Sequence, residues 1–532
     1  MVLSEVFTIM PIPRWSARLV FAAALCSPLL IQLPAQTEAE VNSSIKKFTQ
    51  VYETVEANFA DHVDPDHVVY RGAIPGMLRT LDPHSNFFDP KAYALLREGQ
   101  QGHYYGVGMF VGPSDGKIVV IYPFQGSPAF RAGLRPGDQI ISVNDTNTEH
   151  STTTQVSTML KGPRGTPVTI TVRRLGSDNP IHFSLVRDNV PRGSVNHAFW
   201  LRPGIAYIKI EAFNETTSHE VDQALTKLGE SQIEGLILDL RDNGGGLVQE
   251  CVNVADRFLK KGQLVVSHHG RASQETKFVA KHGERGKEYP IVVVVNRNTA
   301  SASEILTGAL QDHDRAWVLG ESTFGKGLVQ APFPLYGNSA LLLTIAKYYT
   351  PSGRLIQRDY THQGLYEYLS RNEGKTNPKD MKKTDSGRVV FGGDGIAPDE
   401  KYEAPKATKL EGQFIEAQLT GRSPAFYFSP VYFSNHDVHL AKDWRPDDQV
   451  MDAFRDFMLK RGFEFTNAEF DRDRSWIADR LREELYITAF SKEDSEKMAL
   501  QNDPELAKAL ESLPSSKALL DRAHEVIARQ AK

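Results

Sequence analysis

The chain has 532 residues, of which 40% are hydrophobic and 24% are charged, and its formal net charge is −5. This length exceeds that of a single typical domain, and the apolar fraction is sufficient for several buried cores. The slightly acidic balance, without a block of Lys and Arg, argues against a nucleic acid as the main partner.

The first 39 residues have the pattern of an export signal. Arg14 and Arg18 precede an apolar run over residues 19–31, and small and polar residues follow at 34–39. This order predicts a Sec-type signal peptide over residues 1–39. The run is short for a membrane span and contains Pro28, so an uncleaved anchor is the less favoured alternative. We therefore expect an exported protein in the periplasm or cell envelope of a bacterium, membrane-associated if the segment is retained.

Cysteine usage adds one constraint. Removal of the signal peptide would remove Cys26 and leave only Cys251, so we expect no intramolecular disulfide in the mature chain.

Residues 40–97 show helical periodicity. Apolar residues share one helix face in a first segment and form a second cluster soon after: Ile45, Phe48, Val51, Val55 and Phe59, then Ile74, Met77, Leu78 and Leu81. We predict a small packed helical subdomain, with an interaction surface as the alternative.

Residues 98–190 are typical of a compact β-rich module. The segments KIVVIYPF, QIISVN and VTITVRR have strand character, and turns rich in Gly, Pro and Asp separate them. The segment Tyr105–Phe110 resembles the carboxylate-binding loop of a PDZ domain, and residues 134–138 and 161–165 are similar to other PDZ turns.

The tail-binding residues that this resemblance implies are Tyr105, Gly106, Val107 and Gly108. The two glycines would let successive backbone N–H groups converge on a terminal carboxylate, while the peptide adds as a strand to the sheet edge. The alternative is that they only form a tight β-turn.

An α/β core is predicted for residues 191–404. GIAYIKI is a strand, residues 220–228 form an amphipathic helix, and GLILDL is a buried strand that ends at the glycine-rich turn 241–246. Strands that alternate with helices indicate a largely parallel sheet. The turn lacks both the Lys-Ser/Thr of a P-loop and the spacing of a dinucleotide fingerprint, so we do not predict a phosphate site.

The stretch 291–330 carries the candidate chemistry. Five β-branched residues predict a buried strand over 291–295, and the polar turn 296–299 leads to a helix opened by Ser303 and Glu304. Ser301 therefore lies on a strand-to-helix turn, next to a helix N-terminus that favours developing negative charge. Lys326 follows between two glycines, and Gln330 comes four residues later. A serine and a lysine in this setting point to Ser-Lys nucleophilic catalysis.

Ordered motifs connect this stretch with a known family. Residues 45–400 contain, in the family's order, LDPHSNFFDP, YYGVGMFV, SPAFRAGLRPGDQIISVN, LILDLRDNGGGL, TASASEI, FGKGLVQ, AKYYTPSGRLIQ and GGDGIAPD. The chain resembles the tail-specific, or C-terminal processing, serine peptidases, which also carry a helical subdomain ahead of the tail-binding module.

The resemblance implies a role for each matching residue. Ser301 would be the nucleophile, Lys326 the general base and Gln330 the residue that orients the lysine. A backbone N–H of Gly245 or Gly246 would form the oxyanion hole with that of Ala302.

Alternatives exist within the same stretch. Ser303 is a second candidate nucleophile, although it suits a helix cap. His313 could be the base of a Ser-His-Asp triad, but an exposed histidine at a helix end is the preferred interpretation. Asp312 and Glu304 resemble acidic positions that support activity in the family, or else they are helix-surface carboxylates. Thr323 is a candidate hydrogen-bond partner near the lysine.

The mechanism places a requirement on Lys326. It must be neutral to accept a proton, whereas its reference pKa is about 10.4. We therefore expect burial against Phe324, Leu328 and Val329 to lower its pKa. We predict neither a cofactor nor a metal, and the adjacent His268 and His269 are expected to form a strand-and-turn pair.

The rest of the chain is predicted to be a polar surface loop at 372–388 and a helical, charged extension at 405–532. Amphipathic helices are expected at 448–461, 476–489 and 518–531. A packed appendage is the preferred interpretation, and a surface for a second copy or an adaptor is the alternative.

The predicted protein is thus a multidomain α/β serine endopeptidase that binds the C-terminal tails of protein substrates. Two alternatives remain at this stage. One is a non-catalytic PDZ scaffold or chaperone, and the other is a hydrolase that acts on esters or thioesters.

Overall fold

The structure, a computed structural model, describes residues 38–283, 288–360, 368 and 380–530. The predicted signal peptide and part of the predicted 372–388 loop lie outside these residues. The chain divides into two units, residues 1–72 and 73–532. Among the helices that the structure describes, none is both long enough and apolar enough to cross a membrane.

The first unit contains helix α1, Glu38–Asn58, and most of the π-helical turn η1, His67–Ala73. Helix formation is confirmed over α1, which belongs to the helical subdomain predicted for residues 40–97. α1 has no buried residue, and the apolar side chains of its one face are between 39% and 63% exposed. A helix of this length offers a single stripe, which needs a second element before it can be buried.

The second unit begins with three short elements. Helix α2, Ile74–Arg79, is followed by strand β1, Asn86–Phe88, and by helix α3, Pro90–Gln101. Asp89 caps α3 by accepting a hydrogen bond from Ala92 N, and Pro90 occupies the first helical position.

The β-rich module predicted for 98–190 is confirmed. One antiparallel sheet has the order β3-β4-β5-β7-β8, with β6 paired to β5. Its strands are β3 Met109–Ser114, β4 Lys117–Pro123, β5 Gln139–Val143, β6 Thr146–Asn147, β7 Pro167–Arg173 and β8 Ile181–Val186. Helices α4 (Pro128–Arg131) and α5 (Thr153–Leu160) accompany the sheet, and β2 (His103–Gly106) pairs with β9 (Asp188–Pro191) beside it. Because β3 pairs only with β4 among these strands, its other edge is open.

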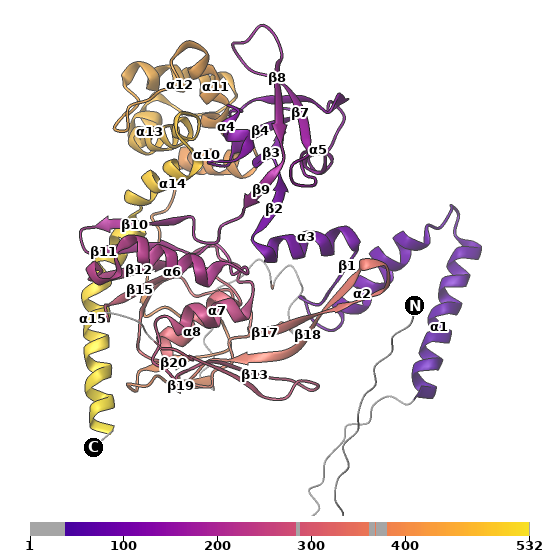
Figure 1. The fold of residues 1–532 in the computed structure, drawn as a ribbon, viewed down its shortest axis with the longest axis vertical. Coiled ribbons are helices and arrows are strands. Elements are labelled where there is room, and N and C mark those ends of the chain that lie inside the picture. Colours follow the sequence, from indigo (N-terminus) through magenta and orange to yellow (C-terminus); the bar gives the residue numbers. More distant parts are fainter. Residues whose placement is uncertain (1–37, 284–287, 361–367, 369–379, 531–532) are drawn as a thin grey trace, which may run out of the picture. The chain divides into compact units, whose positions relative to one another are not determined.

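The α/β core is built on a six-stranded sheet of order β10-β11-β12-β15-β16-β21, which is parallel except for the β10–β11 pair. Figure 1 labels four of these strands, β10, β11, β12 and β15. The strands are β10 His197–Arg202, β11 Ile205–Lys209, β12 Gly235–Asp239, β15 Ile291–Val295, β16 Trp317–Gly320 and β21 Glu400–Lys401. Every residue of β12 and β15 is buried, as expected for central parallel strands covered on both faces.

Successive side chains along these strands point to opposite faces of the sheet and form two separate apolar layers. Leu236, Leu238 and Val293 pack with helices α6 (Thr217–Leu228), α7 (Val248–Asp256) and α8 (Ala302–Asp312) on one face. Ile237, Val292 and Val294 point to the opposite face, where they pack with Leu506, Ala509 and Leu513 of helix α15, Pro504–Gln530. This period of two is the reason that helices cover both faces of the sheet.

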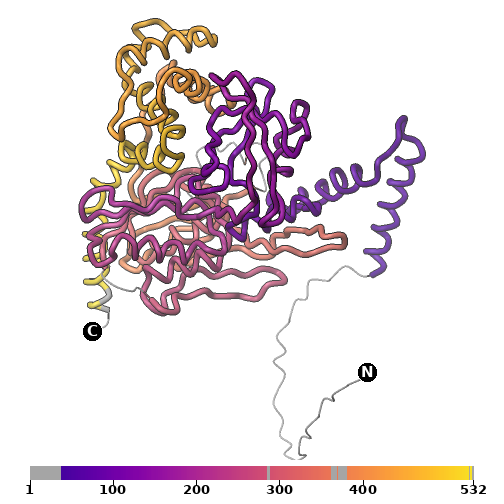
Figure 2. Tube along the Cα trace, turned by 45° about the horizontal axis from the view of Figure 1, so that its top comes forward, coloured from indigo at the N-terminus to yellow at the C-terminus, as the bar shows by residue number. Residues whose placement is uncertain are grey.

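A second sheet lies beside the first and holds a long hairpin, which Figure 2 shows as two adjacent traces. Its order is β1-β18-β13-β14, with β17 paired to β18. The strands are β13 Leu264–His269, β14 Thr276–Val279, β17 Leu328–Pro334 and β18 Ala340–Tyr349. Both His268 and His269 lie in β13 and pair with β18, so the predicted pair is entirely in a strand.

In its described part, the predicted surface loop at 372–388 is only partly correct, because residues 384–388 form a turn with exposed positions but a short strand precedes it. β19, Met381–Lys383, pairs with β20, Val389–Phe391, and Arg388 forms ion pairs with the buried Asp314 and Asp399 at 2.7 and 2.5 Å. The largely buried charge pairs of Arg388 are a feature that polar composition alone does not reveal.

The helical character of the C-terminal region is confirmed. Its helices before α15 are α10 Lys409–Leu419, α11 Pro424–Asn435, α12 Asp448–Lys460, α13 Asn467–Ala489 and α14 Lys492–Gln501. α10 to α13 share an apolar core that includes Phe414, Phe428, Phe454 and Phe470. They therefore form a packed helical appendage, whereas α15 returns to the central sheet and is part of the core.

Candidate active site

Ser301 lies where β15 turns into α8, in a conformation that is rare for a residue with a side chain. It is the N-cap of α8, with φ 56° and ψ −116°, and its side chain is half-buried. Such a backbone conformation costs about 1–3 kcal/mol and persists only where the surroundings enforce it. A strained strand-to-helix turn is also the geometry that exposes a nucleophilic hydroxyl in other hydrolases.

Glu304 is the residue that fixes this turn. Its side chain is 0% exposed and accepts four hydrogen bonds, from Ser301 N (2.8 Å), Thr323 Oγ1 (2.6 Å), Gly325 N (2.6 Å) and Lys326 N (2.8 Å). Burial raises the pKa of Glu304, and the donated hydrogen bonds oppose that rise. A single carboxylate thus holds the backbone of both predicted catalytic residues.

Lys326 is partly buried just before β17. Its Nζ donates to Gln330 Oε1 at 2.8 Å, and the two residues therefore face each other as their spacing predicts. Desolvation by burial lowers the pKa of Lys326, while the nearby Glu304 and Asp82 act to raise it. Ser301 Oγ and Lys326 Nζ do not share a hydrogen bond in this structure.

A histidine that the sequence analysis did not assign completes this end of the site. Gln330 Nε2 donates to His84 O at 2.6 Å, and Asp82 shapes the turn by accepting His84 N at 2.8 Å and Ser85 N at 2.7 Å. Burial and the charge of Lys326 lower the pKa of His84 to about 4, so the ring is neutral. These residues lie in the motif LDPHSNFFDP, whose similarity to the family was the one feature of the sequence that could have pointed to them.

The glycine-rich turn after β12 packs against Ser301. A Cβ on Gly245, whose φ is 97°, would lie 2.7 Å from Ser301 Cβ, so only glycine permits this approach. Gly245 N donates to Asn243 Oδ1 at 2.9 Å. Within the part of the chain that the structure describes, the amides of Gly246 and Ala302 donate to no acceptor.

Two rival assignments are disfavoured by the structure. Ser303 is 0% exposed, and its hydroxyl donates to Asn243 O at 3.0 Å. His313 is the C-cap of α8, whereas Ser301 is its N-cap, twelve residues and about 18 Å away along the helix. The expectation that His313 is exposed is wrong, because its side chain is only 8% exposed and contacts Asp385 Oδ2 and Leu264 O, both at 2.8 Å.

The acidic residues of α8 are not surface carboxylates. Asp312 is 1% exposed and pairs with Arg354 at 2.6 Å, far from the nucleophile end of the helix. Thr323, in contrast, lies at the centre of the site, where it donates to Glu304 and its Oγ1 accepts Ile396 N at 2.7 Å.

The predicted tail-binding loop joins β2 to β3. The Val107 side chain is 2% exposed in the core of the module, while Tyr105 is 45% exposed. Gly108 has φ 76°, and its carbonyl accepts Ser127 Oγ at 2.7 Å. Over the described residues, neither Val107 N nor Gly108 N donates a hydrogen bond, although both residues are buried.

Comparison with known proteins identifies the family. Residues 204–364 match the model of peptidase family S41, residues 119–174 match a PDZ domain, and residues 28–92 match the N-terminal domain of the activating protease CtpB. A carboxy-terminal-processing protease of Bartonella bacilliformis is 32% identical over 461 residues, which are 85% of this chain and 96% of that protein. The chain belongs to peptidase family S41.

Other S41 relatives agree with this assignment. The carboxy-terminal processing protease CtpB of Bacillus subtilis is 32% identical over 327 residues, 61% of this chain and 68% of that protein. Among solved structures, a photosystem II D1 C-terminal processing protease is 29% identical, with a TM-score of 0.36 and coverage of 67% of this chain and 86% of that one. The fold expected from the sequence, an α/β S41 peptidase with a PDZ domain, is confirmed by the two family matches and by the two sheets that carry them.

Proposed function

We propose that this S41 protein is a serine endopeptidase in which Ser301 is the nucleophile, Lys326 the general base and Gln330 the residue that orients the lysine. The observation that carries the proposal is the shared anchor: Ser301 N and Lys326 N both donate to Glu304 Oε2 at 2.8 Å. One buried carboxylate thereby fixes the two segments that must act together.

The lysine is suited to its role. Its lowered pKa increases the neutral fraction near neutral pH. In the neutral amine, one N–H is donated to Gln330 Oε1, which leaves the lone pair free to accept the proton of Ser301.

The reaction would proceed in two steps. Ser301 Oγ attacks the peptide carbonyl while Lys326 takes its proton, and the same proton is returned to the leaving amine as the C–N bond breaks. Water then attacks the acyl-enzyme, with Lys326 again accepting a proton and returning it to Ser301. We assign the oxyanion contacts to the amides of Gly246 and Ala302, because the amide of Gly245 is already donated to Asn243.

The substrates that we propose are proteins with exposed C-terminal tails. A tail would add as a strand at the open edge of β3, with its carboxylate on the amides of residues 107 and 108. Binding there would raise the local concentration of nearby peptide bonds at Ser301.

We further propose export to the bacterial periplasm or envelope through residues 1–39. Amino-terminal sequencing of the protein from a periplasmic fraction should find a start near residue 40. A protein that keeps Met1 and stays in the cytoplasmic fraction would contradict this proposal.

Cleavage of an unstructured protein with an apolar C-terminal tail tests the function. The wild type should cut it, Ser301→Ala should bind but not cut it, and His313→Ala should retain cleavage if it folds normally. A wild type that binds the tail and never cleaves would favour the scaffold function, and failure of His313→Ala alone would mean that the base was wrongly assigned.

The pH dependence of cleavage should report Lys326. Because Lys326 acts when deprotonated and burial lowers its pKa, kcat/KM should rise with pH up to that lowered pKa and then level off. Below it, kcat/KM should fall by about tenfold per pH unit. His84, with a pKa of about 4, should add no ionisation above pH 5. If His84→Gln removed the midpoint of the kcat/KM profile, the ionisation would not belong to Lys326.

Tail recognition should depend on Gly108. A Cβ there would lie 2.3 Å from Ser127 Cβ, so Gly108→Ala should distort the loop and weaken tail-peptide binding by at least about tenfold. Gly133→Ala is the matched control, because Gly133 also has a positive φ, 84°, but its Cβ would meet nothing within 4 Å. Equal affinity of both variants, measured by fluorescence anisotropy, would exclude this loop as the tail site.

A further inference from the structure

Helix α15 begins at the edge of the central sheet that carries the proposed catalytic turn. A Cβ on Gly320, the last residue of β16, would lie 3.2 Å from Glu505 Oε1. Near the middle of the helix, Ser516 Oγ donates at 2.8 Å to the carbonyl of Ile291, the first residue of β15. α15 therefore runs from the carboxyl ends of the strands toward their amino ends, and its first turn is on the catalytic side.

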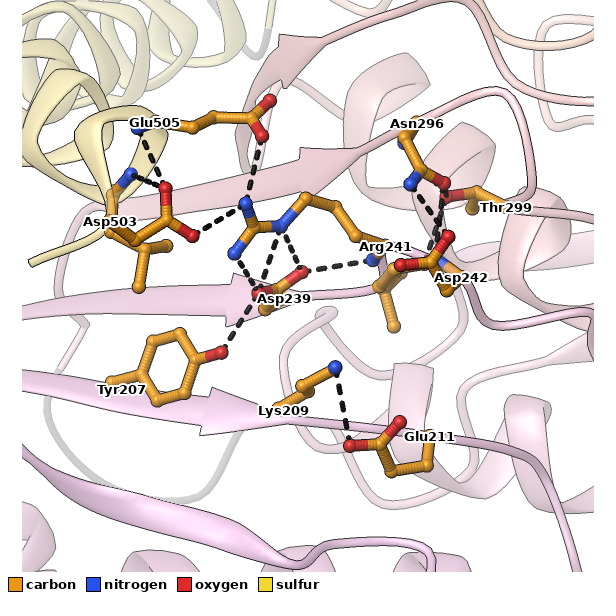
Figure 3. Close-up of polar contacts among 12 residues, drawn as sticks. Tyr207, Lys209, Glu211, Asp239, Arg241, Asp242, Asn296, Thr299, Asp503 and Glu505 are labelled. Carbon is orange, nitrogen blue, oxygen red and sulfur yellow. Dashed lines mark hydrogen bonds and ion pairs between the residues drawn. The ribbon is translucent and has the colours of Figure 1, made fainter. Parts of the chain in front are cut away.

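The first turn of α15 binds a residue of the glycine-rich loop. Asp503 Oδ2 and Glu505 Oε2 each lie 2.8 Å from Arg241 Nη1. Figure 3 draws both carboxylates turned toward this guanidinium. Asp503 also accepts Glu505 N at 2.8 Å through its other oxygen, so it caps the helix and pairs with the arginine at once. With only 14% of its side chain exposed, Arg241 makes these contacts largely out of water.

Arg241 is held from a second side by the strand that precedes it. Its Nη2 lies 2.6 Å from Asp239 Oδ2, and its backbone N donates to Asp239 Oδ1 at 2.9 Å. Asp239 is 0% exposed and also accepts the hydroxyl of Tyr207 at 2.8 Å. The arginine thus joins the end of β12 to the start of α15.

The loop that Arg241 opens is tied to the nucleophile. Asp242 N donates to Asn296 Oδ1 at 3.0 Å, and Asn243 O accepts Ala300 N at 2.9 Å. Two residues later, Gly245 packs on Ser301. A continuous set of polar contacts therefore runs from α15 through Arg241 and the loop to the strained turn of Ser301.

We propose that Asp503 and Glu505 are positioning residues of the peptidase reaction, and that the first turn of α15 is therefore needed for full catalytic activity. By holding Arg241 they would fix the 241–246 loop, and with it the Gly246 amide, at the distance that the oxyanion requires. Small displacements of such donors reduce rates strongly, because the stabilisation depends on preorganised geometry. The inference rests on the function proposed above.

The test uses the full chain with Asp503→Asn and Glu505→Gln combined. Both changes remove charge and keep size, and Asn remains a good helix cap, so α15 should still form. Glu511→Gln is the matched control on the same helix, because its side chain is 71% exposed and makes only a 3.5 Å pair with Lys508. Three quantities are measured for each variant: kcat and KM for the tail-bearing substrate, affinity for the isolated tail peptide, and the rate at which a fluorophosphonate labels Ser301.

The expected result is a fall of kcat and of the labelling rate by about tenfold or more in the double variant, with KM and tail affinity unchanged within about twofold. The control should match the wild type. The fraction of molecules labelled at the end of the reaction is measured as well as the rate. A fraction near one would show that the double variant is folded even though it reacts slowly.

Two other outcomes overturn the inference. A double variant with wild-type kcat and labelling rate, while Ser301→Ala is inactive, would refute the positioning role and leave the proposed function intact. Loss of activity matched by a lower end-point fraction, with the remaining molecules reacting at the normal rate, would show that the pair supports folding only. If the wild type neither cleaves nor is labelled at Ser301, the proposed function fails and this inference fails with it.

Discussion

Replacing Lys326 with methionine is expected to abolish peptide-bond cleavage while the tail still binds. Methionine keeps most of the side-chain volume but has no lone pair that can accept the Ser301 proton. In serine proteases with a Ser-His-Asp triad, loss of the nucleophile or the base lowers kcat by about 10⁴-fold or more, and we expect a loss of that order here. Stability should change little, because the gain from replacing a desolvated lysine by an apolar side chain is opposed by loss of the hydrogen bond that Gln330 Oε1 accepts.

Cleavage of the tail-bearing substrate, followed over hours, measures the loss, and fluorescence anisotropy measures the binding that should persist. Lys347→Met is the matched control: Lys347 is exposed on β18, directly opposite Leu328 of β17, and should tolerate the change. Cleavage by Lys326→Met within tenfold of the wild type would rule out Lys326 as the general base.

The second large effect is expected for Glu304→Gln. The carboxylate accepts four hydrogen bonds, whereas the amide of glutamine has one acceptor oxygen and turns two donors of its own toward the remaining donors. Unsatisfied buried donors cost about 1–3 kcal/mol each, so the free energy of unfolding should fall by about 2 kcal/mol or more. The amide oxygen can replace only one of the two carboxylate oxygens, so one of the two pairs of donors that hold the site loses its acceptor. We therefore expect kcat to fall by about 10²-fold as well.

Urea unfolding and steady-state kinetics separate these two effects. Glu416→Gln, an exposed position on α10, provides the control and should change neither quantity. If Glu304→Gln kept the stability and the kcat of the wild type, the carboxylate would not be the anchor of the site.

Several features of the fold were predictable because the sequence pattern of a short segment was enough to determine its structure. The run of β-branched residues at 291–295 is a fully buried strand, and Gly245 of the turn 241–246 approaches Ser301 so closely that a Cβ would block it. The spacing of Lys326 and Gln330 likewise predicted their contact.

Other features depend on contacts between distant segments, which periodicity does not encode. Glu304 looks like an ordinary first-turn carboxylate, and only the folded chain brings Thr323, Gly325 and Lys326 to it. The same holds for His84, whose carbonyl meets Gln330 across 246 residues. α15 looked like one more amphipathic helix of the extension, because its apolar stripe does not reveal which surface it covers.

The most direct measurement is peptide mapping of the serine that a fluorophosphonate modifies in the active, full-length chain. A single adduct on Ser301, formed stoichiometrically with loss of peptidase activity and absent in Lys326→Met, is the predicted result. An adduct on Ser303, or complete inactivation with Ser301 unmodified, would contradict the assignment of Ser301 as the nucleophile.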